Sequence, residues 1–61
     1  MITINKYVDI YDIAKNNNDF IINLSNLSIR ERLRVIDFLS GLIFKHGKIE
    51  KLSSDTFKIS L

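Results

Sequence analysis

The chain has 61 residues, of which 46% are hydrophobic and 26% charged, with nine Lys and Arg against seven Asp and Glu. A chain of this length forms one small domain, which excludes multi-domain proteins and large enzymes. There is no Cys and a single His, His46, so neither a disulfide framework nor a metal site is expected. Oligomerisation is then the remaining support for so small a core. The net charge of +2 does not indicate a strongly cationic protein.

No apolar run approaches the 18 or so residues that span a bilayer. No basic start followed by an apolar segment marks a signal peptide either. These features predict a soluble, cytoplasmic protein.

The first half of the chain predicts two short strands around a helix. Residues 1–4 are apolar and β-branched, as in a strand, and Asn5 is a candidate cap for a helix over residues 7–16. The apolar run at 20–24 lies between polar turns and predicts a strand covered on both faces, at the centre of the sheet. The helix prediction depends on the spacing of its apolar residues, Tyr7, Ile10, Ile13 and Ala14.

A second, longer helix is predicted in the middle of the chain. Ser28 and Glu31 have the spacing of a capping box, in which each side chain bonds the other residue's backbone N–H. The helix can continue to about Lys45, and Gly47 is the expected left-handed stop.

Two alternating segments at the C-terminal end, residues 48–52 and 56–61, predict a hairpin joined by turn formers at 53–55. The predicted order is therefore β-α-β-α-β-β. This order indicates an α+β two-layer sandwich, with two helices packed on one face of a small mixed sheet.

The second helix carries two apolar stripes. The first, with Leu39 at its edge, is predicted to cover the sheet. The second is predicted to contact either the first helix or another subunit, and Phe38 is the hardest of its residues to hide within the chain. The first stripe consists of Ile29, Leu33, Ile36, Ser40 and Ile43, and the second of Val35, Phe38 and Leu42.

Gly41 strengthens the subunit interpretation of the second stripe. Glycine inside a helix costs about 1 kcal/mol relative to Ala, and a helix often accepts this where another backbone approaches closely. The alternative is a tolerated surface glycine. The predicted self-association face is therefore Val35, Phe38, Gly41 and Leu42.

No catalytic constellation is present, because the chain has no Cys, no interpretable Ser/His/Asp set, no glycine-rich phosphate loop and no metal-ligand cluster. We expect no enzymatic activity and no cofactor. Arg30, Arg34 and Lys45 share the side of the helix that carries Gly41, where they either bind phosphate or an acidic partner or form a solvated face.

The segment Arg34–Gly41, which reads Arg-Val-Ile-Asp-Phe-Leu-Ser-Gly, resembles the centre of the SepF family of cell-division proteins. The resemblance extends upstream through residues 20–24 to 12–14 and downstream through 46–52 to 56–57. The order of elements agrees with that of the family. The family's sheet has five strands, however, and little or no sequence remains here for the last one.

This resemblance implies a non-enzymatic adaptor that binds the C-terminal tail of FtsZ, dimerises and polymerises, and ties FtsZ filaments to the membrane at the division septum. The family's tail-binding Lys and Phe match Lys51 and Phe57, and Gly41 matches a glycine used in subunit contact. The family anchors itself through an N-terminal amphipathic helix. Because Met1 already belongs to the predicted domain, which covers residues 1–61, we expect membrane attachment to be indirect or through a segment absent here.

Two other classes remain open. Small nucleic-acid-binding domains of the Alba and initiation-factor type share this order of elements, but Glu50 and Asp55 interrupt the hairpin lysines Lys48, Lys51 and Lys58, which disfavours phosphate binding. A purely structural oligomer is the other class. For such an oligomer, the substitutions Lys51→Glu and Phe57→Ala would leave every interaction unchanged.

Overall fold

The predicted order of strands and helices is confirmed in the computed structural model, which describes residues 1–61. Both strands of the hairpin end within one residue of their predicted bounds. The elements are β1 (Ile2–Thr3), α1 (Asp9–Asn16), β2 (Asp19–Asn23), α2 (Ile29–Leu42), β3 (Lys48–Lys51) and β4 (Thr56–Ser60).

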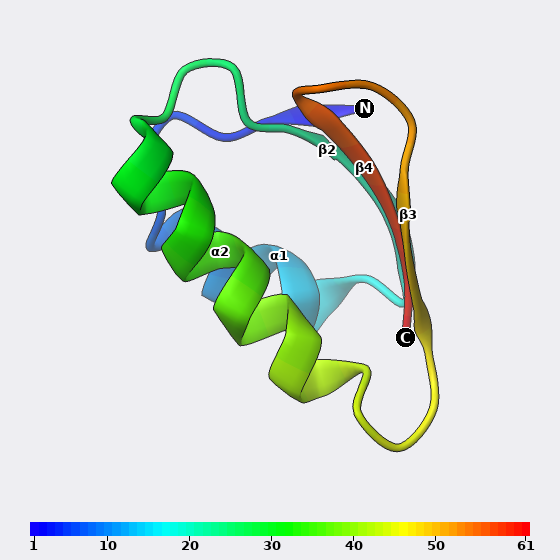
Figure 1. Cartoon of the computed structure of the whole chain (residues 1–61). Coiled ribbons are helices and arrows are strands. Elements are labelled where there is room, and N and C mark those ends of the chain that lie inside the picture. The colour runs from blue at the N-terminus through cyan, green and yellow to red at the C-terminus, as the bar shows by residue number, and fades with distance from the viewer.

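The four strands form one mixed sheet in the order β1-β2-β4-β3, in which only β1 and β2 run parallel. Both helices lie on the same side of this sheet (Figure 1), which confirms the α+β sandwich. β2 is an interior strand, as predicted, but only one of its faces is covered. Ile22 is fully buried, whereas its neighbour Ile21 points to the open face and is partly exposed.

The core is made of nine buried residues, all apolar, and no polar side chain is buried. Every element except β3 contributes to it directly or through an adjoining residue, and β3 adds the partly buried Ile49. Neither helix has the length and apolar composition that a bilayer crossing requires. The core residues are Ile4, Ile10, Phe20, Ile22, Leu24, Leu27, Val35, Leu39 and Ile59.

The capping box of α2 is confirmed. The Glu31 backbone N–H donates to the Ser28 hydroxyl at 3.2 Å, and the Ser28 backbone N–H donates to the Glu31 carboxylate at 3.0 Å. The helix ends at Leu42, three residues earlier than predicted. Gly47 does adopt a positive φ of 126°, but in the turn that leads into β3, so it shapes that turn rather than ending the helix.

The predicted start of α1 is wrong by two residues. A turn over residues 6–8 precedes the helix, in which the Asp9 N–H donates to the Lys6 carbonyl. Val8 occupies the cap position without a side-chain hydrogen bond. Asn5 does not cap the helix, because its side-chain oxygen accepts a hydrogen bond from the Asn26 amide at 2.8 Å.

The prediction of which stripe of α2 faces the sheet is right only in part. Leu39, predicted at the edge of that stripe, is buried, and Ile36 packs against the core. Val35 and Leu39 are 0% exposed, whereas Ile29 and Leu33 are 76% and 59% exposed. The start of the predicted stripe, Ile29 and Leu33, therefore lies outside the core, and Val35 of the second stripe enters it. On the opposite side of the helix, Phe38 packs against Tyr11 of α1, so residues of the second stripe are also covered within the chain.

Candidate functional site

The β3–β4 hairpin brings Lys51 and Phe57 together. The two residues are directly opposite each other in the antiparallel register, so their side chains leave the sheet on the same face, about 5 Å apart at Cβ. Phe57 is also opposite the buried Ile22 on β2, which identifies this face as the one that the helices cover. The two residues predicted to form a site are therefore neighbours in space.

The pair combines a partly buried aromatic ring with an exposed cation. Phe57 packs against the core along part of its surface and is held there. Lys51 is exposed and forms no ion pair. The one salt bridge of the structure joins Arg32 to Asp55. No pocket is hollowed beside the pair, so a ligand would lie on the surface. Such a surface suits a peptide that carries an apolar side chain and a carboxylate.

The other two hairpin lysines lie on the opposite face of the sheet. Lys58 follows Phe57 and is paired with Glu50, so the two charges are cross-strand neighbours on the open face. Lys48 belongs to the same face, since it alternates with Ile49. The three lysines therefore do not form one basic patch, and Lys51 is the only one beside Phe57.

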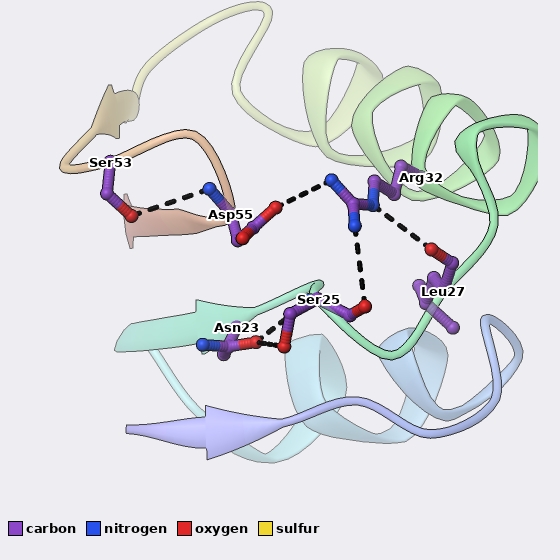
Figure 2. Close-up of polar contacts among 6 residues, drawn as sticks. All are labelled: Asn23, Ser25, Leu27, Arg32, Ser53 and Asp55. Carbon is purple, nitrogen blue, oxygen red and sulfur yellow. Dashed lines mark hydrogen bonds and ion pairs between the residues drawn. The ribbon is translucent and has the colours of Figure 1, made fainter.

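Sequence reasoning did not identify Arg32 as a contributor to this region. Its guanidinium extends from α2 to the turn of the hairpin and bonds the Asp55 carboxylate at 2.6 Å (Figure 2). The two residues are 23 positions apart. No local pattern signals this contact, because it depends on how the helix lies over the sheet.

The residues predicted for self-association differ in how far the structure buries them. Val35 is a core residue, so its side chain is not available to a second molecule, which corrects the prediction for this position. Phe38, predicted to be hard to hide, is half-buried against Tyr11 of α1. Gly41 is exposed with open space where a Cβ would be, and Leu42 is exposed.

One α1 residue, Tyr11, extends this surface and was missed from the sequence. Its side chain is about half-exposed. Tyr11 meets Phe38 edge to face, so its ring continues the surface that Phe38, Gly41 and Leu42 begin. A projection of α2 alone has no information about α1, and so could not have found Tyr11. We call Tyr11, Phe38, Gly41 and Leu42 the interhelical face.

One ionisable group is clearly perturbed. The Ser28 backbone N–H, and then its hydroxyl, hold the pKa of Glu31 below its ordinary value, with a smaller contribution from Arg34. This shift belongs to the helix cap and not to the hairpin. No three His, Cys, Asp or Glu side chains come together as metal ligands.

The geometry defines a class of small α+β domains in which two helices cover one face of a mixed sheet and leave a hairpin at its edge. Residues 1–60 match the family model described as "Cell division protein SepF". A protein of Ruminiclostridium cellulolyticum named "Cell division protein SepF" is 42% identical over 53 residues, which are 85% of this chain and 34% of that protein. The chain belongs to the SepF family, and it spans about a third of the length of this relative.

Proposed function

We propose that this chain is a division adaptor that binds the C-terminal tail of FtsZ through Lys51 and Phe57, and that self-associates to organise FtsZ filaments at the septum. The observation that carries this proposal is the direct pairing of the two residues across β3 and β4. Family membership supplies the context of cell division. The proposed location is the cytoplasmic side of the membrane at the division site.

The chemistry of the pair supports a short peptide as the ligand. A partly buried ring can cover an apolar side chain of the peptide without losing much conformational entropy, because it is already held by the core. The free Lys51 ammonium can pair with a carboxylate beside that side chain. The edge position of β3 leaves this end of the sheet open to an extended chain.

The proposal is tested by titrating the protein with a labelled peptide that copies the last dozen or so residues of the host's FtsZ, at two salt concentrations. Phe57→Ala is expected to abolish binding, and Lys51→Glu to weaken it by roughly tenfold or more. Lys58→Glu is the matched control, since it makes the same charge change at the residue that follows Phe57 in the sequence, but on the open face. It should leave the affinity within about twofold.

Thermal unfolding of each variant separates lost binding from lost structure. Lys51 is exposed, so its variant is expected to stay folded even if the partly buried Phe57 position does not tolerate Ala. Equal peptide affinity for the wild type, Phe57→Ala and Lys51→Glu would overturn the proposed site. Duplex DNA serves as a second ligand, and DNA binding that falls steeply with salt, without peptide binding, would assign the chain to the nucleic-acid-binding class.

We place self-association on the interhelical face. Tyr11 and Leu42 leave apolar surface exposed there, and Gly41 leaves room for a neighbouring backbone. Burial of this surface in a second copy would add apolar contacts to a chain whose own core is only nine residues.

A further inference from the structure

Arg32 connects three segments of the chain. Its Nε donates to the Leu27 carbonyl at 3.1 Å and its Nη2 to the Ser25 carbonyl at 3.4 Å, both in the loop that joins β2 to α2. Its Nη1 donates to the Asp55 carboxylate in the hairpin turn (Figure 2). The side chains of this ion pair are 31% and 36% exposed, so solvent screens it only in part.

Asp55 is held from a second side as well. Its backbone carbonyl accepts a hydrogen bond from the Leu24 N–H at 2.8 Å, which ties the turn to the end of β2. Within the turn, the Leu52 and Ser53 N–H groups both donate to the Thr56 carbonyl. The guanidinium of Arg32 is therefore the link between this turn and the helix layer.

The Lys51–Phe57 pair lies at the end of the ladder that this turn closes. It is the pair of the β3–β4 register nearest the turn, and Asp55 precedes Phe57 by only two residues. β3 is an edge strand, so β4 is the only strand that holds Lys51. Pairs at the end of an edge strand open first, because few contacts oppose their opening.

We infer that Arg32 is a positioning residue: by holding Asp55, it fixes the turn end of the hairpin and so the relative placement of Lys51 and Phe57. This inference rests on the proposed function of that pair. The planar guanidinium is required, because it donates in three directions from fixed positions. A lysine ammonium at the same place cannot reproduce that arrangement.

The test uses Arg32→Gln and Arg32→Lys, with Arg30→Gln as a matched control on the same helix, at an exposed arginine outside this network. Amide hydrogen exchange is measured at Leu52 and Ser53, in the turn. It is also measured at Leu61, which bonds Asn18 at the far end of β4. Both Arg32 variants should speed exchange in the turn by roughly five- to tenfold and leave Leu61 unchanged.

The same variants are then titrated with the tail peptide, and both should bind it several-fold more weakly. Asp55→Asn should weaken binding to a similar extent, and adding it to Arg32→Gln should cause little further loss, because both changes break one contact. Unchanged turn exchange, equal acceleration throughout the chain, or full recovery by Arg32→Lys would overturn the inference. If the Arg32 variants exchange faster in the turn but the wild-type protein itself binds no peptide, the proposed function alone is overturned.

Discussion

The ring of Phe38 on α2 meets the ring of Tyr11 on α1 edge to face, with centroids 4.7 Å apart and the ring planes at 83°. This contact joins the two helices into one layer. The side of α2 that carries Phe38 faces α1, while Val35 and Leu39 enter the core. Gly41 and Leu42 are left at the outer rim of this contact, where a second molecule can reach them.

Gly41→Lys is expected to leave the fold intact and to disrupt self-association. Nothing lies within 4 Å of the position where a Cβ would stand, so a lysine fits the monomer without a clash. In an assembly, the long charged side chain would separate the two interhelical faces. Light scattering over a range of concentrations would show a smaller species for Gly41→Lys, and an unchanged size would place the subunit contact elsewhere.

The two glycines should respond oppositely to alanine. Gly41→Ala, studied at low protein concentration, should raise the free energy of unfolding by about 0.5–1 kcal/mol, because Ala is the better helix former and the space is open. Gly47→Ala should lower it by roughly 1–3 kcal/mol, because φ is 126° there and a Cβ would lie 2.7 Å from the Ser60 carbonyl oxygen. Urea denaturation of the two variants checks both signs, and equal changes would contradict the prediction.

Two leucines of α2 provide a direct check on which side of the helix is buried. Leu39→Ala should lower the free energy of unfolding by roughly 2–5 kcal/mol, since the side chain is fully enclosed and its removal leaves a cavity. Leu33→Ala, the same substitution at an exposed position, should change it by about 0.5 kcal/mol or less. Chemical denaturation measures both values, and a larger loss at Leu33 would mean that Leu33, and not Leu39, faces the core.

Stability should fall in acid through Glu31. Its pKa in the folded chain lies below the ordinary value of 4.5, because the Ser28 backbone and hydroxyl stabilise the carboxylate. The stabilisation is therefore complete above the unfolded-state pKa, and is lost as the pH falls through the lower folded-state pKa. Thermal midpoints from pH 6 down to pH 3 should show this loss.

Ser28→Ala is the control for the acid effect. It removes the hydroxyl that helps to lower the pKa of Glu31. It should also cost about 1 kcal/mol at neutral pH, because that hydroxyl accepts the Glu31 backbone N–H in the helix cap. The variant should also show a shallower fall in stability with acid than the wild type. The Ser28 backbone N–H remains in the variant, so identical pH profiles for the two proteins would mean that the hydroxyl does not contribute to the acid response.

The sequence by itself determined the local features of this protein. The Ser28–Glu31 spacing located the start of α2, the alternation at 48–52 and 56–61 located the hairpin, and the order of elements indicated the α+β sandwich. The segment Arg34–Gly41 pointed to the family that the comparisons confirm. All of these depend on residues close together in the chain, whose spacing the local backbone geometry converts directly into structure.

Only the tertiary structure decided which apolar side chains of α2 are buried, which residue holds the hairpin turn and that Tyr11 of α1 extends the interhelical face. Periodicity reveals that a helix has apolar stripes, but each stripe of α2 has buried and exposed members, and which ones enter the core depends on how the helix packs. The Arg32–Asp55 contact spans 23 positions and arises only when the helix lies over the sheet. Contacts of this kind carry no local signal, because chain folding, and not residue spacing, brings the partners together.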